Sequence, residues 1–383
     1  MRKTITIGDL GTVITGKTPP TTNKNYYGDY AVFIKPTDIS ESSKFTYETE
    51  EMYSKVAAEK YSSSLIPKGA ICVPCIGTIG TKMTMTHCAC FTNQSINSIV
   101  CNDKYDNEYV YYLIKNFLPD LKSYNKGTAS GREYVSKSSF ESIELQAEQD
   151  IDVQRKIGQI LSRYDALIEN YQRQIKLLEE AAQRLYKEWF VDLRFPGHQS
   201  TPIINGIPKG WEKKNVDFIY SIKYGKNLST KLISETGQFP VYGANGVIGY
   251  YKEANCNEQV VLITSRGNGS GDVLMTYHSD AFITNNSFIV TPNAEFSYCK
   301  LPFTFQFLRN ANFRAVRTGA AQPQLTNQSI HTVVVTLPTR ELITDYCRLT
   351  CNGNSMIIKL RNQIRNLSEA RDRLLPKLMS GEA

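Results

Sequence analysis

A long helical pattern occurs twice in this chain, 189 positions apart, and it constrains the fold more than any other feature. Residues 174–189 read QIKLLEEAAQRLYKEW and residues 363–378 read QIRNLSEARDRLLPKL, and the two align without a gap. In both copies apolar residues recur at alternating steps of three and four, which is the seam of a coiled coil. Arg371 interrupts the second seam, opposite Ala182 in the first. The remaining seam residues are Ile168, Tyr171, Ile175, Leu178, Leu185 and Trp189 in the first copy, and Ile357, Leu360, Ile364, Leu367, Leu374 and Leu378 in the second.

The segments that precede the two helical patterns also correspond. ICVPCIGTIG…TNQSINSIV (71–100) matches VLITSRGNGSG…TNNSFIV (261–290), and KGTASGREYVSKSSFESIEL (126–145) lies over TGAAQPQLTNQSIHTVVVTL (318–337). Short strands separated by Gly, Pro and Asn turns indicate mostly-β domains. We therefore predict an α+β fold in which two similar mostly-β domains are each followed by a long helix. The predicted boundaries are domain 1–150, helix 151–195, domain 196–339 and helix 340–383.

The two helices are expected to pair with each other. The first should run from about Val153 to Phe190, a rod of roughly 55 Å at 1.5 Å per residue, and FPGHQSTP (195–202) ends it. The second should start near Arg340, and CNGNS (351–355) is the place where it could be interrupted. Two such seams in one chain pack most economically on each other, so we predict an antiparallel coiled coil with pseudo-twofold symmetry between the halves. The alternative is that each helix docks on its own domain or on another subunit.

The stretch GTVITGKT (11–18) fits the phosphate-loop pattern G-x-x-x-x-G-K-[ST]. A phosphate loop needs a helix that starts at the Lys-Thr and directs its N-terminus at the anion. The residues that follow, PPTTNKNYYGDY, carry no helical apolar periodicity. In the second copy Tyr220 stands where the first glycine should be, ahead of Gly225 and Lys226. The repeat therefore favours a shared Gly-Lys turn that presents a lysine to an anion, and we reject an ATP site.

The two-copy layout, the opening IGDLGTVITGKTPP, the elements KGTASGREYV and TGAAQPQLT, and the paired QIKLLEEAAQRL and QIRNLSEARDRLLPKLMSGE together resemble the specificity (S) subunits of Type I restriction–modification systems. The resemblance covers essentially the whole chain. It implies two target-recognition domains that each read half of a bipartite sequence in double-stranded DNA, with the helices setting the unread spacer. It also implies no catalysis by the chain itself. The expected partners are two methyltransferase (M) subunits, which would use S-adenosylmethionine to methylate adenine, and two restriction (R) subunits, which would use ATP and Mg²⁺.

Under this resemblance the DNA contacts should lie on the exposed loops, where phosphate contacts position the protein and base contacts specify the sequence. The Gly-Lys turns are the candidates for phosphates, while Arg266 suits guanine and Asn268 suits adenine. Because the loops of the two domains differ, we expect different half-sites. The full set of candidates is Lys17, Thr18, Thr78, Thr81, Lys82, Lys126, Arg132, Lys226, Asn227, Tyr242, Asn245, Arg266, Asn268, Ser270, Arg314, Arg317, Gln322 and Gln324.

Composition suits a DNA-binding protein of the cytoplasm. The net charge is +7, and residues 196–340 carry 13 Lys and Arg against 8 Asp and Glu, a surplus that favours nucleic acid but is shared by many ordinary domains. The nine irregularly spaced cysteines favour reduced thiols. The first residues lack the apolar core of a signal peptide, and no apolar run is long enough to span a membrane.

Three other interpretations were weighed. A coiled-coil scaffold with two protein-binding domains would show the same helices without basic reading loops, and a nucleotide-dependent enzyme would require Lys17. Cys72 and Cys75 have the ingredients of a zinc site together with His87, Cys88 and Cys90. The second copy lacks the first cysteine pair, however, so we predict no metal site. No G-x-S-x-G nucleophile motif is present, which supports a DNA reader without an active site.

Overall fold

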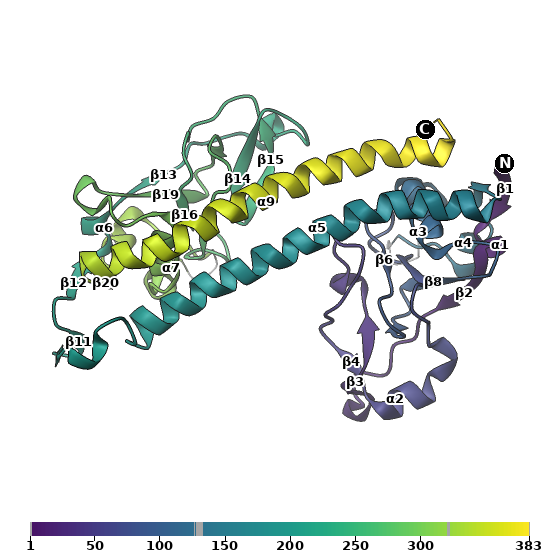
Figure 1. The fold of residues 1–383 in the computed structure, drawn as a ribbon, viewed down its shortest axis with the longest axis horizontal. Coiled ribbons are helices and arrows are strands. Elements are labelled where there is room, and N and C mark those ends of the chain that lie inside the picture. Colours follow the sequence, from purple (N-terminus) through teal and green to yellow (C-terminus); the bar gives the residue numbers. More distant parts are fainter. Residues whose placement is uncertain (1, 126, 128–132, 320–321, 383) are drawn as a thin grey trace. The chain divides into compact units, whose positions relative to one another are not determined.

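The computed structural model describes residues 2–125, 127, 133–319 and 322–382 (Figure 1). The chain divides into two compact units. Unit 1 comprises the residues up to Asn170 and those from Gln363 onward, and unit 2 comprises Tyr171–Asn362. Each unit therefore contains one mostly-β domain together with a part of both long helices.

The described strands of unit 1 form three small sheets. Two of these sheets carry the loops that matter below, and the third joins the two ends of the domain. The four-stranded sheet has the order β2 (Gly11–Thr15), β8 (Ile96–Cys101), β5 (Ile71–Pro74), β6 (Thr84–Met85); the three-stranded sheet has the order β4 (Met52–Tyr53), β3 (Tyr27–Ile34), β7 (Phe91–Thr92); and β1 (Arg2–Thr6) pairs with β9 (Glu144–Glu148). Strands β3 and β7 are parallel, and the other pairs are antiparallel.

Unit 2 repeats this topology strand for strand. Its four-stranded sheet has the order β13 (Tyr220–Tyr224), β19 (Ser287–Pro292), β16 (Val261–Thr264), β17 (Val273–Met275); its three-stranded sheet has the order β15 (Gly246–Tyr251), β14 (Phe239–Gly243), β18 (Phe282–Ile283); and β12 (Glu212–Asn215) pairs with β20 (Val334–Leu337). Again one pair, β14 with β18, is parallel. A short hairpin of β10 (Ile203–Ile204) and β11 (Ile207–Pro208) precedes the domain. The prediction of an α+β chain with two similar domains is confirmed.

The shorter helices also correspond between the units. Helix α3 (Asn107–Phe117) of unit 1 and helix α7 (Leu301–Arg309) of unit 2 bury most of their side chains between a β-domain and a long helix. The remaining short helices are α1 (Ile7–Leu10), α2 (Lys55–Lys60) and α4 (Lys137–Glu141) in unit 1, and α6 (Val216–Ile219) and α8 (Asn327–Ile330) in unit 2. Helices α3 and α7 therefore connect the sheets of each domain to the long helices.

The long helices are α5 (Ile151–Tyr186), which continues as a π-helical turn over Lys187–Val191, and α9 (Arg340–Ser380) (Figure 1). Both helices enter the core of each unit. In unit 1 the core includes Ile157 and Leu161 of α5 and Leu375, Leu378 and Met379 of α9. In unit 2 it includes Tyr186, Trp189 and Phe190 of α5 and Ile343, Tyr346 and Cys347 of α9.

Within unit 2 the two helices run in opposite directions. The Tyr346 hydroxyl donates to the carbonyl of Ala182 at 2.9 Å, and Gly353 lies against Leu178. Residue numbers therefore increase along α9 in the direction in which they decrease along α5. The predicted antiparallel pairing is thereby confirmed. The predicted seam faces inward, with Ile168, Ile175, Trp189, Ile357, Leu360 and Leu378 buried and Tyr171, Leu178, Leu185, Ile364, Leu367 and Leu374 partly buried.

Two details of the helices differ from expectation. Helix α5 begins at Ile151, slightly before the expected Val153, and α9 continues without a break through residues 351–355. Asn and Gly are poor helix formers, but Thr350 and Ile357 on either side of this stretch are buried. Packing of the flanking residues therefore outweighs the low helix propensity of this stretch, and that low propensity was the reason to expect a break.

Because Gly353 lies within a helix, Gly353→Ala is expected to raise the free energy of unfolding by about 0.5–1 kcal/mol. The added Cβ would meet Leu178 Cδ2 at 3.7 Å, an ordinary van der Waals contact. Urea denaturation followed by circular dichroism measures the change. Gly249→Ala is the matched control: Gly249 has φ +144°, and its Cβ would lie 2.4 Å from Ile233 Cγ2, so this variant should lose stability. A destabilised Gly353→Ala would contradict the continuous helix.

Candidate nucleic-acid interface

The Gly-Lys turn of the first domain uses its backbone amides internally. Gly16 N donates to the carbonyl of Ile96 at 3.2 Å, and Lys17 N donates to that of Thr92 at 2.9 Å. Residues 16–23, all of them described, form no helix, so nothing directs a helix N-terminus at this turn. Phosphate loops depend on free amides and such a helix. The match to the phosphate-loop pattern is therefore a coincidence of sequence, and what the turn offers is the exposed Lys17 side chain.

The second domain builds the same turn. Gly225 N donates to the carbonyl of Ser287 at 3.0 Å, and Lys226 N donates to that of Ile283 at 2.9 Å. In both domains the acceptor carbonyls lie within the T-N-x-S turn (residues 92–95 or 284–287) or directly beside it, although they are offset by one position between the two domains. A Cβ on Gly16 would lie 2.1 Å from the carbonyl oxygen of Thr92, and one on Gly225 would lie 2.3 Å from that of Thr284. Glycine is required here because the two backbones approach so closely.

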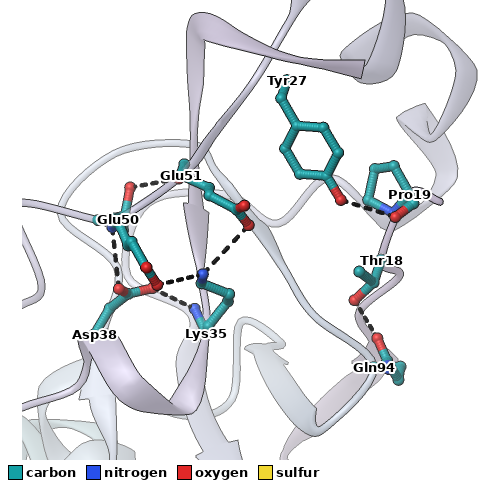
Figure 2. Close-up of polar contacts among 9 residues, drawn as sticks. Thr18, Pro19, Tyr27, Lys35, Asp38, Glu50, Glu51 and Gln94 are labelled. Carbon is teal, nitrogen blue, oxygen red and sulfur yellow. Dashed lines mark hydrogen bonds and ion pairs between the residues drawn. The ribbon is translucent and has the colours of Figure 1, made fainter. Parts of the chain in front are cut away.

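Lys17 and Lys35 differ in how far their charge is neutralised, and Figure 2 shows Lys35 with its partners Glu50 and Glu51. Lys35 Nζ lies 2.7 Å from Glu50 Oε2 and 3.2 Å from Glu51 Oε2. Burial would lower the pKa of Lys35, but these two carboxylates outweigh it and raise the pKa. Lys17 instead donates to the Ser63 hydroxyl at 3.3 Å, a neutral partner. Lys17 therefore keeps its positive charge available to an anion, whereas Lys35 does not.

A second pair of loops is held by hydrogen bonds between corresponding segments in both domains. The loop that follows β5 in the first domain, or β16 in the second, is hydrogen-bonded to two segments. One is the T-N-x-S turn, and the other is the segment before α4 or α8. In the first domain the bonds are Cys75 N to Ser95 O (2.7 Å), Gly77 N to Glu133 O (3.0 Å) and Val135 N to Cys75 O (2.9 Å). In the second they are Ser265 N to Asn286 O (2.8 Å), Gly267 N to Pro323 O (3.0 Å) and Leu325 N to Ser265 O (2.7 Å).

This shared frame presents different side chains in the two domains. Ile76 occupies the position that Arg266 holds in the second domain, because each forms the β-bridge between the two joined segments. Thr78 and Asn268 are also equivalent and exposed, since each follows a glycine in the left-handed region, with φ +79° in the first domain and +83° in the second. The first domain thus offers an apolar group and a hydroxyl where the second offers a guanidinium and an amide. The exposed side chains at these equivalent positions therefore differ in chemistry between the two domains.

In the second domain three loops meet at this frame. Arg317 Nη1 donates to the carbonyl of Asn268 at 3.3 Å, and Arg314 Nη2 lies 2.5 Å from Asp272 Oδ1. Asn245 Oδ1 would lie 3.3 Å from a Cβ on Gly269, which places the 243–246 turn against the same loop. Arg314 is thus paired with a carboxylate, while Arg266 projects outward and is exposed. Arg266, Asn268 and Asn245 are therefore the exposed polar side chains at the place where these three loops meet.

Most of the predicted contact residues lie on the surface, and two do not. Tyr242 is 3% exposed; its hydroxyl accepts from Tyr277 N at 3.1 Å and bonds His278 Nδ1 at 2.9 Å. Ser270 is fully buried. These two residues are corrected to interior positions, because β14 turns Tyr242 into the domain and the loop folds over Ser270. The exposed or partly exposed candidates are Lys17, Thr18, Thr78, Thr81, Lys82, Lys226, Asn227, Asn245, Arg266, Asn268, Arg314, Arg317, Gln322 and Gln324. Lys126 and Arg132 lie outside the described residues.

The T-N-x-S turns contribute two residues that were not among the candidates. Gln94 is exposed and its side-chain oxygen bonds the Thr18 hydroxyl (Figure 2). Asn286 is partly exposed in the equivalent turn. Each lies between the Gly-Lys turn and the Gly-rich loop, since the T-N-x-S turn bonds both. The repetition of T-N-x-S in the two copies was the available signal, because a motif retained in both copies marks a shared structural role.

Cys72, Cys75 and Cys90 are buried free thiols. Burial raises the pKa of both the Cys72 and the Cys75 thiol to about 12, which disfavours the thiolate that zinc requires. Within the part of the chain that the structure describes, no three His, Cys, Asp or Glu side chains gather as a ligand set. The described helices also include none with the length and apolar character needed to cross a membrane.

Comparison with known proteins gives one consistent result. The model of the Type I restriction modification DNA specificity domain matches residues 2–180 and 208–342. The MjaIX Type I restriction enzyme specificity subunit of Methanocaldococcus jannaschii is 27% identical over 412 residues, covering 98% of this chain and 92% of that protein. The HindI specificity subunit of Haemophilus influenzae is 39% identical over 142 residues, 36% of this chain and 30% of its own length. The crystal structure of the Type I system S subunit from M. genitalium, at 18% identity, shares the fold with a TM-score of 0.58 and covers 99% of this chain and 96% of its own.

Proposed function

The chain belongs to the Type I restriction modification DNA specificity family, and from this premise we propose that it reads a bipartite sequence in double-stranded DNA, one half-site per domain. The observation that carries the proposal is the pair of loops that follow β5 and β16, each held by backbone hydrogen bonds to the T-N-x-S turn and to the segment before α4 or α8. Their backbone hydrogen bonds join the same segments in both domains, while the exposed side chains at equivalent positions differ. Such an arrangement suits two recognition modules that bind DNA in the same way and read different bases.

Within each domain we assign separate roles to the two loops. Lys17 and Lys226, on rigid turns fixed by two backbone bonds each, contact phosphates and set the position of the domain. Arg266 contacts a guanine edge and Asn268 an adenine edge in the major groove, which are the pairings that their side-chain geometry favours. Asn245, beside the same loop, adds an amide to the reading surface.

The long helices set the spacer between the half-sites, and the chain itself performs no catalysis. Two M subunits methylate adenine with S-adenosylmethionine, and two R subunits with ATP and Mg²⁺ complete the restriction complex. Support for these partners comes from the names of the relatives, which are specificity subunits of Type I restriction enzymes. A scaffold that binds two proteins is the rival function, and it would have no salt-dependent affinity for DNA.

The test of the proposal is methylome sequencing of a host that expresses this chain with its neighbouring methyltransferase subunit. The control host lacks only this chain. Methyladenine at one split motif with a fixed gap, present only when the chain is expressed, is the expected result. If no motif depends on the chain while the methyltransferase subunit is expressed and folded, the proposed function is wrong.

The two assigned roles give different signatures in a binding assay. Arg266→Ala should weaken binding to the cognate half-site by about 1–3 kcal/mol and relax selectivity at one base. Lys226→Ala should weaken all sequences alike and reduce the slope of log K against log salt by about 0.9. The exposed helical Lys359 supplies the control, since Lys359→Ala removes the same charge away from the loops. Equal losses on cognate and random DNA for both loop variants would refute the division of roles.

A further inference from the structure

A charged pair is buried on the helix seam of unit 1. Arg371 Nη1 of α9 pairs with Asp165 Oδ1 of α5, and each residue is only 7% exposed. The hydroxyl of Tyr112, on α3 of the recognition domain, donates to the other carboxylate oxygen, Asp165 Oδ2, at 2.6 Å. Arg371 Nε also donates to Asp372 Oδ1 at 2.9 Å. Both oxygens of Asp165 are therefore satisfied, one from each neighbouring helix.

The layers next to this pair are apolar. On α5, Leu161 and Ile168 lie one turn before and after Asp165, and they are 0% and 3% exposed. On α9, Leu375 and Leu378 follow Arg371 and belong to the core of unit 1. A charge can be buried in such surroundings only when it is paired and hydrogen-bonded. A single polar layer in an apolar seam is also the established means by which helix pairs specify their register.

The equivalent layer of unit 2 carries no such pair, and the interhelical ion pair that unit 2 does have, Arg361 with Glu179 at 3.0 Å, lies in another layer and is partly exposed. The 189-residue shift places Ala182 opposite Arg371 and Asn354 opposite Asp165. Tyr112 is the sixth residue of α3, and the sixth residue of α7 is Gln306. Ala182, Asn354 and Gln306 all line a cavity of about 380 Å³ in unit 2. Gln306 is 4% exposed, and its Oε1 has no partner among the described residues. The layer that is filled by three bonded polar groups in unit 1 is thus partly empty in unit 2.

We propose that the Asp165–Arg371 pair, capped by Tyr112, fixes the register of α5 against α9 and so positions the two recognition domains for a single spacer length. This inference rests on the proposed function in one respect, that the helices set the spacer. The pair can act because only one register satisfies it. A slip of one heptad would place Asp165 beside Ile364 or Leu378, so its buried carboxylate would lose its cation and Arg371 would keep only its helical neighbour Asp372. The apolar residues alone discriminate less well, since Leu and Ile recur every heptad.

A one-heptad slip has a predictable size. Seven residues at 1.5 Å each displace one helix along the other by roughly 10 Å. That is close to three base pairs of duplex DNA at about 3.4 Å per pair. Tyr112 adds to the effect because it connects α3 of the recognition domain to the same carboxylate. The domain and the helix register are therefore fixed at one point.

The test uses the full-length chain and removes the charges without opening a hole. The permissive variant combines Tyr112→Phe, Asp165→Leu and Arg371→Met, since apolar replacement of a buried ion pair is often neutral for stability. The rescue variant is the reversed pair, Asp165→Arg with Arg371→Asp. Ile364→Leu is the matched seam control that leaves the pair intact. If the permissive variant does not fold by circular dichroism, Asp165→Asn with Arg371→Gln replaces it, because it removes both charges at nearly constant volume.

Register is read directly by spin labels, introduced as p-acetylphenylalanine adducts at the exposed Leu177 and Met356, both in unit 2. Pulsed electron resonance should give one distance between the two labels in the unsubstituted and reversed-pair chains. The permissive variant should show a second label-to-label distance, the one expected when one helix has moved along the other by roughly 10 Å. One unchanged distance in all variants would overturn the inference, whether or not the chain binds DNA.

The spacer is the second readout, and it separates this inference from the proposed function. Binding to DNA that carries both half-sites with spacers varied base pair by base pair should peak at one length for the unsubstituted and reversed-pair chains. The permissive variant should gain a second optimum about three base pairs away. A single unchanged optimum in the permissive variant overturns the inference and leaves the proposed function standing. If the unsubstituted chain binds no DNA that carries the split site, the proposed function is refuted. The spin-label distances then still test whether the pair fixes the register of the helices.

Discussion

Arg371→Ala is expected to lower the free energy of unfolding by about 3–5 kcal/mol, because it leaves the carboxylate of Asp165 buried without its cation. The remaining donor, the Tyr112 hydroxyl at 2.6 Å, is neutral and does not compensate a full negative charge. Denaturant titration monitored by circular dichroism measures the loss. The neighbouring Arg373 is exposed, and Arg373→Ala should change the free energy of unfolding by less than about 0.5 kcal/mol.

A double-mutant cycle identifies the source of this loss. If the buried charge is responsible, adding Asp165→Ala to Arg371→Ala should recover part of the lost stability, because no unpaired charge then remains. If instead the loss comes from the cavity left by the arginine stem, the second truncation should add to it. Additive losses from the two substitutions would therefore show that Arg371 acts through packing alone.

Gly225→Ala is expected to cost about 3 kcal/mol of unfolding free energy and to weaken binding to the half-site of the second domain. The new Cβ would lie 2.3 Å from the carbonyl oxygen of Thr284 and 2.5 Å from that of Ile283, so the turn and its partner must separate. This would break the bonds that Gly225 and Lys226 donate to the T-N-x-S region and displace the lysine. Thermal unfolding and DNA titration measure the two effects.

The control for this substitution separates steric overlap from backbone strain. Gly267 has φ +83°, but a Cβ there would meet nothing within 4 Å. Gly267→Ala should therefore cost only about 1 kcal/mol, the penalty for an L-residue in the left-handed region. If Gly225→Ala is no worse than Gly267→Ala, the close approach of the two turns is not what retains glycine at position 225.

The phosphate-loop match shows why a local pattern can mislead. Gly16 and Lys17 are where the pattern requires them, but whether their amides are free depends on Thr92 and Ile96, which lie about eighty residues away in the chain. The repeat argues against a phosphate loop by a different route, since Tyr220 breaks the pattern in the second copy. Comparing the two halves was thus more informative than matching either half to a motif.

The candidate interface could be predicted in part. Lys226, Arg266 and Asn268 were predictable because Gly-rich turns between strands lie at the surface. Tyr242 was not, since its place in the turn-like sequence VYGANG (241–246) resembles a loop, whereas its hydroxyl is held inside by Tyr277 N. Gln94 was missed because T-N-x-S reads as a turn former, and only the fold places it beside Thr18.

The sequence by itself determined the two-copy α+β plan, the two heptad seams and the family, because periodicity and repetition are properties of the chain that survive without knowledge of contacts. Only the tertiary structure decided what Arg371 does. In the sequence it is one charged residue that interrupts an apolar seam; its partner Asp165 lies 206 residues earlier, and Tyr112 comes from a different domain element. A buried charge is stable only with such partners, and partners so distant in the chain are identified by packing, which no local pattern encodes.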